Sequence, residues 1–119
     1  ALLIATPEYN NGIPGVLKNA IDWLSRPPAD IARVFGGKPV AVVGATIGAF
    51  GTALAQSAWL PVLRLFNVRP YFGARLMIAR AADVFDAGGK VKDETVAQQI
   101  RSFADGFVRF VREVCAAPA

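Results

Sequence analysis

The stretch that decides the fold is ALLIATPEYNNGIPGVLKNAIDWL, residues 1–24. Its first six residues are continuously apolar, which is typical of a strand buried on both faces of a parallel sheet. From Pro14, which suits the first turn of a helix, the spacing changes. Apolar side chains then recur on one helical face at Leu17, Ala20, Ile21 and Leu24. The sequence therefore predicts a strand at 1–6, a turn, and a helix at 14–24 that ends before the prolines of RPPAD.

The same strand–helix alternation continues along the chain. We predict a second strand at 39–45 and a second helix at 52–66, which Pro61 should kink near Ser57 or shorten by a turn. A third, less regular strand is expected at 70–79. A glycine turn follows, and Asp93 should cap a long final helix. This order favours one α/β domain over residues 1–119, with three parallel strands adjacent in chain order.

Composition excludes several classes of function. The 119 residues are 54% hydrophobic, and the net charge of +4 comes from scattered basic residues, so we expect no nucleic-acid partner. Residues 39–63 are uncharged and long enough to span a bilayer, but a strand, a glycine loop and a helix explain them better, so no membrane is expected. We predict no metal site. Cys115 has no histidine to activate it and is interpreted as a small hydrophobe at a helix end. With one cysteine and no visible signal peptide, we expect a cytoplasmic protein.

Two turns follow the first two predicted strands, at residues 6–14 and 44–52. Ligands of open α/β sheets bind beyond the carboxyl ends of the strands, so these turns should lie side by side at a ligand site. Gly44, Gly48 and Gly51 match neither the P-loop nor the dinucleotide glycine pattern. The glycines allow either close approach of the backbone to a flat or bulky ligand or simply a tight turn, and the loop alone leaves both readings open.

The tract TPEYNNGIPGVLKNAIDW, residues 6–23, closely resembles the NADPH-dependent FMN reductases, which include quinone, chromate and azo reductases. GKPVAVVGATIGAFGTALAQ at 37–56 resembles the family's second loop, and AADVFDAGGKVKDE at 81–94 resembles its closing turn. The resemblance covers essentially the whole chain. It implies a flavodoxin-like three-layer α/β sandwich with a parallel sheet, with FMN and NADPH or NADH as cofactors. It also implies electron transfer to quinones or similar small acceptors, such as chromate, azo compounds or free flavin.

The resemblance also implies the site residues. Pro7, Glu8, Tyr9 and Asn10 match the loop along the flavin ring, and Thr46 and Gly48 match positions of the second loop. Ile47 stands where proline is common in the family and Ala49 where arginine is frequent. We predict no catalytic side chain, because hydride transfer belongs to the flavin. Glu8 could act as a general base, although a role mainly through its backbone is favoured.

Family members begin with a further strand and a phosphate loop of the form S-x-R-x-x-S, which this sequence does not contain. We therefore expect a C-terminal portion without the family's N-terminal strand and phosphate loop, which binds FMN more weakly than a chain that includes them. The family implies a homodimer or homotetramer through the helices after the two loops, with either Trp23 or Trp59 at the interface. Two alternatives remain open: a non-catalytic flavin-binding module, and a structural fragment of such a reductase.

Overall fold

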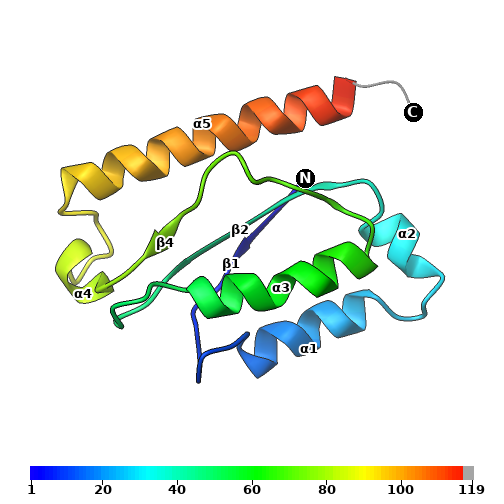
Figure 1. Ribbon diagram of the computed structural model, residues 1–119, viewed down its shortest axis with the longest axis horizontal. Coiled ribbons are helices and arrows are strands. Elements are labelled where there is room, and N and C mark those ends of the chain that lie inside the picture. The colour runs from blue at the N-terminus through cyan, green and yellow to red at the C-terminus, as the bar shows by residue number, and fades with distance from the viewer. Residues whose placement is uncertain (117–119) are drawn as a thin grey trace.

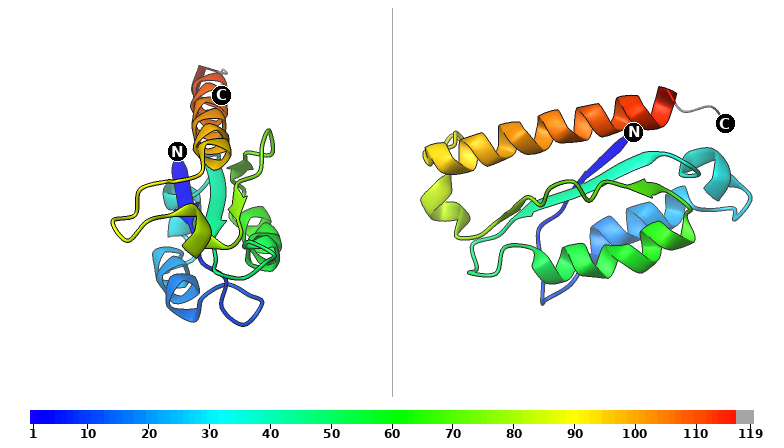
Figure 2. Two further views of the ribbon diagram at one scale, coloured as in Figure 1. Left: turned by 90° about the vertical axis from the view of Figure 1, so that its left-hand side faces the viewer. Right: turned by 45° about the horizontal axis from the view of Figure 1, so that its top comes forward.

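The computed structural model describes residues 1–116, and they form three layers around a parallel sheet (Figure 1). Helices α1 and α3 lie side by side under one face, and α5 runs along the other (Figure 2). The short helices α2 and α4 lie at opposite ends. In chain order the elements are β1 (Leu2–Ala5), α1 (Gly15–Leu24), α2 (Asp30–Val34), β2 (Pro39–Ala45), α3 (Ala53–Leu65), β3 (Arg69–Pro70), β4 (Met77–Ile78), α4 (Ala81–Val84) and α5 (Glu94–Ala116).

The sheet has the predicted order and direction. β1 pairs with β2 in parallel from Leu2↔Val40 to Ala5↔Val43, and β3 and β4 both pair in parallel with the other side of β2. The predicted third strand at 70–79 is nevertheless wrong as a continuous strand, because it is split into these two pieces. The intervening segment leaves the ladder after Tyr71, whose N–H donates to the carbonyl of Val40 at 2.8 Å, and it carries the exposed Phe72.

The start of the chain corrects two expectations. The described residues begin with a strand, β1, so the sheet does have an N-terminal strand; the further strand and phosphate loop expected ahead of it stay predictions. The expectation that β1 is buried on both faces is wrong, since Ile4 is buried but Leu3 is 52% exposed. α5 packs over β2 and β4 rather than over β1, sharing a core with Val43 and Ile78 and leaving Leu3 uncovered.

Two apolar cores hold the layers together. On the α1 and α3 side the buried residues are Ile4, Ile21, Phe35, Val40, Trp59, Leu63 and Phe66. On the α5 side they are Ala41, Leu76, Ile78, Val84 and Phe103. Trp59 is fully buried and Trp23 is 72% exposed, so Trp59 is a core residue. No helix within residues 1–116 is both long and apolar enough to cross a bilayer.

Helix boundaries follow the local signals with two differences. α3 runs unbroken through Pro61, so no turn is lost; Pro61 leaves the carbonyl of Ser57 without its usual donor, and Ser57 is exposed, where water can replace that donor. α2 and α4 were not predicted, because helices of five and four residues show no apolar period.

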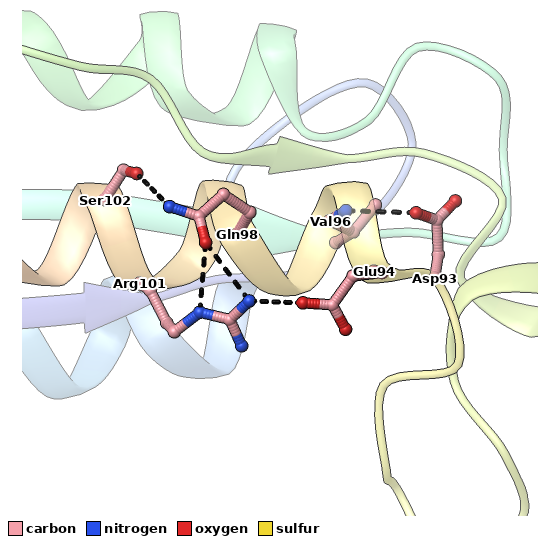
Figure 3. Close-up of polar contacts among 6 residues, drawn as sticks. All are labelled: Asp93, Glu94, Val96, Gln98, Arg101 and Ser102. Carbon is pink, nitrogen blue, oxygen red and sulfur yellow. Dashed lines mark hydrogen bonds and ion pairs between the residues drawn. The ribbon is translucent and has the colours of Figure 1, made fainter.

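The Asp93 cap is confirmed: its carboxylate accepts a hydrogen bond from the N–H of Val96 at 3.1 Å, beside the Glu94–Arg101 ion pair (Figure 3). Cys115 is exposed in the last turn of α5.

Tyr71, the residue after β3, packs against α5. The Tyr71 ring packs against Phe103, Phe107 and Phe110, with centroids 5.5–5.7 Å apart. Its hydroxyl lies directly against the α5 backbone at Gly106, so a Cβ there would collide with the phenolic oxygen. Gly106 is therefore retained in the middle of a helix because of a tertiary contact, although glycine is a poor helix former.

We expect Gly106→Ala to lower the free energy of unfolding by about 1–2 kcal/mol, because overpacking outweighs the gain of about 1 kcal/mol in helix propensity. The double variant Gly106→Ala/Tyr71→Phe removes the hydroxyl that causes the collision and should be at least as stable as the parent. Urea unfolding of the parent, both single variants and the double variant measures the coupling. Additive effects of the two substitutions would show that the contact does not constrain α5.

Candidate functional site

The two predicted loops leave the same edge of the sheet. β1 and β2 are parallel and in register up to Ala5↔Val43, and the N–H of Thr6 continues the ladder to the carbonyl of Val43 at 2.9 Å. The chain then enters residues 6–14 on one strand and 46–52 on the other (Figure 1). The prediction that both loops lie at one rim of the sheet is confirmed.

The first loop contains a tight two-residue turn. Tyr9 and Gly12 exchange backbone hydrogen bonds at 3.0 and 3.1 Å, and the central residues Asn10 and Asn11 have φ of 50° and 59°. Positive φ at both central positions is the pattern of a type I′ turn, which asparagine tolerates. The turn leaves the Tyr9 side chain 59% exposed and both asparagines exposed at the rim, with their amides available to a ligand.

Glu8 joins the two loops through its side chain. One carboxylate oxygen, Oε2, accepts hydrogen bonds from the N–H groups of Leu54 and Ala55, both at 2.9 Å. These N–H groups belong to the first turn of α3, where they have no partner within the helix and where the helix dipole favours a negative charge. The side chain of Glu8 therefore has a structural role that the sequence did not predict, while its role toward a ligand stays a prediction. Its carboxylate caps a helix that starts 45 residues later.

The strand ends beneath the loops are packed without spare room. A Cβ on Gly44 would lie 2.5 Å from Oγ1 of Thr52 and still closer to the carbonyl oxygen of Thr6. Both threonines are buried, and Thr52 Oγ1 accepts a hydrogen bond from Gln56 Nε2 at 2.9 Å. Gly44 is therefore needed for the close approach of β2 to the first loop and to the start of α3, not for ligand binding.

The second loop is held from the opposite side by the segment that follows β4. The N–H of Thr46 donates to the carbonyl of Ile78 at 2.9 Å, and the carbonyl of Thr46 accepts from Ala81 at 3.0 Å. The carbonyl of Gly48 accepts from the N–H of Arg80 at 3.0 Å. The tip projects into solvent, with Ile47 and Phe50 each 83% exposed. Sequence reasoning missed this support, because no local pattern links residues 46–48 to 78–81.

The structure thus places all six predicted site residues at one rim. Pro7, Glu8, Tyr9 and Asn10 come from the loop after β1, and Thr46 and Gly48 from the loop after β2. Glu8 is the sole charged side chain in the two loops, and one of its two carboxylate oxygens, Oε2, accepts both backbone donors. Within residues 1–116 no three His, Cys, Asp or Glu side chains gather as a metal site would require.

The residues of this rim fit the ring of FMN. A Cβ at Gly48 would meet nothing closer than 3.9 Å, so the backbone there is open to a flat group. Tyr9 offers an exposed aromatic face, and asparagine amides and backbone N–H groups are the donors and acceptors that a pyrimidine edge requires. The lack of a free charge in the loops also suits a neutral ring system.

The sequence of this chain is similar to those of known flavin and quinone reductases. Residues 1–83 match the family model for NADPH-dependent FMN reductase. An NAD(P)H-dependent FMN reductase from Pseudomonas aeruginosa is 44% identical over 96% of this chain and 60% of its own length. A 2-hydroxy-1,4-benzoquinone reductase from a Burkholderia species is 40% identical over 94% of this chain and 60% of its own length.

A solved structure has the same architecture. FerB, a flavoenzyme NAD(P)H:(acceptor) oxidoreductase from Paracoccus denitrificans, superposes with a TM-score of 0.83 at 37% identity. The match covers 95% of this chain and 61% of FerB. The present chain therefore spans about three fifths of the length of these relatives.

Proposed function

This chain belongs to the NADPH-dependent FMN reductase family, and from that premise we propose that it acts as an FMN-dependent NAD(P)H oxidoreductase that passes electrons to quinones or similar small acceptors. The observation that carries the proposal is the pair of hydrogen bonds from Leu54 and Ala55 to Glu8. They hold the loop after β1 against the helix that follows the loop after β2. Both loops are thereby fixed at one rim before any ligand binds, as a site for a rigid ring requires.

Each residue of the rim has a proposed role. FMN, when bound, would supply the redox chemistry, accepting electrons from the dinucleotide and passing them to the acceptor. Tyr9 and Asn10 would contact the ring and its pyrimidine edge, and Thr46 would offer a hydroxyl from the second loop. Gly48 would let the backbone approach the ring closely. Glu8 would position the two loops, because its Oε2 accepts hydrogen bonds from two N–H groups at the start of α3.

The proposal is tested by titrating FMN and following the quenching of its fluorescence, and then by measuring NADPH oxidation with a benzoquinone as acceptor. The titration should extend to millimolar FMN, because the phosphate loop predicted for the family is not among residues 1–119. Flavin binding without NADPH oxidation would favour a non-catalytic flavin-binding module. No flavin binding at any concentration would favour a purely structural fragment.

Alanine substitutions at two glycines distinguish an effect on FMN binding from an effect on folding. Gly48→Ala places a methyl group where the ring is proposed to lie, and we expect at least a tenfold loss of FMN affinity with an unchanged melting temperature, because nothing within 3.9 Å opposes the methyl group in the free protein. Gly15→Ala, where a Cβ meets nothing within 4 Å, is the matched control and should leave FMN affinity unchanged. Equal FMN affinity in the parent and Gly48→Ala would remove Gly48 from the site.

We further propose a homodimer or homotetramer through the outer faces of α1 and α3. Val16, Trp23 and Leu24 on α1 are 54–80% exposed, and Leu54 and Leu65 on α3 are 49% and 72% exposed. The two helices lie side by side (Figure 1), so these side chains lie on one helical layer. Exposed tryptophan is enriched in the energetically dominant part of interfaces.

Trp23→Lys should weaken self-association by a factor of about 30 or more, since such an anchor contributes about 2 kcal/mol or more. Val108→Lys is the matched control, because Val108 is 47% exposed on α5, which covers the opposite face of the sheet from α1 and α3 (Figure 2). Sedimentation velocity over a concentration series measures both. A Trp23→Lys protein that associates like the parent would contradict the interface.

Cytoplasmic location and a chromate or azo acceptor stay predictions.

A further inference from the structure

We propose that Arg80, which lies outside both predicted loops, binds a phosphate group of the nicotinamide dinucleotide at the rim of the site. This inference rests on the proposed oxidoreductase function. It adds a positive charge to a site whose loops otherwise carry only the carboxylate of Glu8, which is bonded to the start of α3. Arg80 precedes α4 and follows β4, so it comes from a third strand end at the same edge of the sheet as the two loops.

The main chain of Arg80 is fixed against the second loop. Its N–H donates to the carbonyl of Gly48, and the next N–H, that of Ala81, donates to the carbonyl of Thr46, both at 3.0 Å. Two adjacent hydrogen bonds define both the position and the orientation of the peptide. The Cα of Arg80 is therefore next to Gly48, where the flavin ring is proposed to lie.

Arg80 keeps its side chain at a position that suits glycine. Its backbone has φ 49° and ψ 49°, the left-handed region that disfavours any residue with a Cβ. The residue is exposed, and among residues 1–116 its guanidinium forms no ion pair and no hydrogen bond with another residue. Strained backbone that no fold contact of the side chain compensates is typical of functional positions.

The charge at this position complements a dinucleotide. NADH carries a pyrophosphate and NADPH carries a further 2′-phosphate, and the planar guanidinium of arginine binds phosphate oxygens through two parallel hydrogen bonds. Lys92, the cation whose ammonium reaches the same short helix, already donates to the carbonyl of Ala82 at 3.3 Å. Arg80 is the cation whose own main chain is bonded to the second loop, and among residues 1–116 its guanidinium has no partner.

The test uses Arg80→Gly, which removes the guanidinium and relieves the left-handed backbone, together with Arg80→Lys, which keeps a charge. Arg64→Ala is the matched control, an exposed arginine in the last turn of α3, at the far end of that helix from the rim. Binding of NADP⁺ and of NAD⁺ to the FMN-loaded protein is measured by calorimetry, melting temperature by scanning fluorimetry, and KM with NADPH and NADH by steady-state kinetics.

We expect Arg80→Gly to weaken dinucleotide binding about 10- to 100-fold, the range for a lost charge-assisted hydrogen bond, while its melting temperature stays the same or rises. Arg80→Lys should retain part of the affinity, and Arg64→Ala all of it. A loss confined to NADP⁺ assigns the contact to the 2′-phosphate, and a loss for both dinucleotides assigns it to the pyrophosphate.

Unchanged affinity in Arg80→Gly would overturn this inference and leave the proposed function intact. A fall in melting temperature parallel to the fall in affinity would also overturn it, because Arg80 would then be structural. A parent protein that binds FMN but neither dinucleotide would overturn the proposed oxidoreductase function together with this inference.

Discussion

Gly44→Ala should lower the free energy of unfolding by about 3 kcal/mol or more, the upper end of what overpacking a core costs. The added methyl group would lie 2.5 Å from Thr52 Oγ1 and would overlap the carbonyl oxygen of Thr6. Neither neighbour can move cheaply. Thr6 is held in the ladder by its N–H, which donates to Val43, and Thr52 is fully buried and hydrogen-bonded to Gln56.

Chemical denaturation followed by far-ultraviolet circular dichroism measures this effect. Gly15→Ala is again the control, because Gly15 lies in the first turn of α1 with nothing within 4 Å of an added Cβ. It should leave stability unchanged or raise it by up to about 1 kcal/mol. If Gly44→Ala unfolds at the same denaturant concentration as the parent, the strand ends beneath the site are looser than described.

Glu8→Ala should produce two effects together: a loss of about 2 kcal/mol in stability, and at least a tenfold loss of FMN affinity. The stability term follows from removing a charged acceptor from two N–H groups at a helix N-terminus. It is less than the sum of two buried charge-assisted hydrogen bonds, since Leu54 is exposed and water can replace the carboxylate. The affinity term follows because the first loop is then no longer tied to α3.

Glu8→Gln removes the negative charge of the side chain but keeps a hydrogen-bond acceptor of the same size. The amide oxygen can still accept from Leu54 and Ala55, so the loop should stay in place, while the favourable interaction of a negative charge with the helix dipole is lost. We expect about half of the stability loss and little loss of FMN affinity. Glu113→Ala, an exposed acid near the end of α5, controls for the change in net charge. A Glu8→Ala protein with the FMN affinity of the parent would show that the loop does not depend on this cap.

Local sequence determined the elements and their order. The apolar run at 1–6, the 3.6-residue period after Pro14 and the β-branched run at 39–45 are each short-range signals, and each gave an element within a residue or two of its observed bounds. The Asp93 cap could be predicted from local sequence as well, because the capping side chain accepts a hydrogen bond from an N–H only three residues further along the chain. Alternation of strands and helices then leaves few possible topologies, so the parallel order and the shared rim followed as well.

Tertiary structure decided everything that joins residues distant in the chain. The sequence placed Glu8 at the site, but only the packing of the first loop against α3 brings its carboxylate to N–H groups 46 and 47 residues away. Trp23 and Trp59 both lie in the helices that follow the two loops, and the packing of each helix leaves one exposed and buries the other. Arg80 reaches the second loop because β4 pairs with β2 and ends beside it. Hydrophobic period and turn residues report the local backbone, whereas these contacts depend on the relative placement of whole elements, which no local pattern encodes.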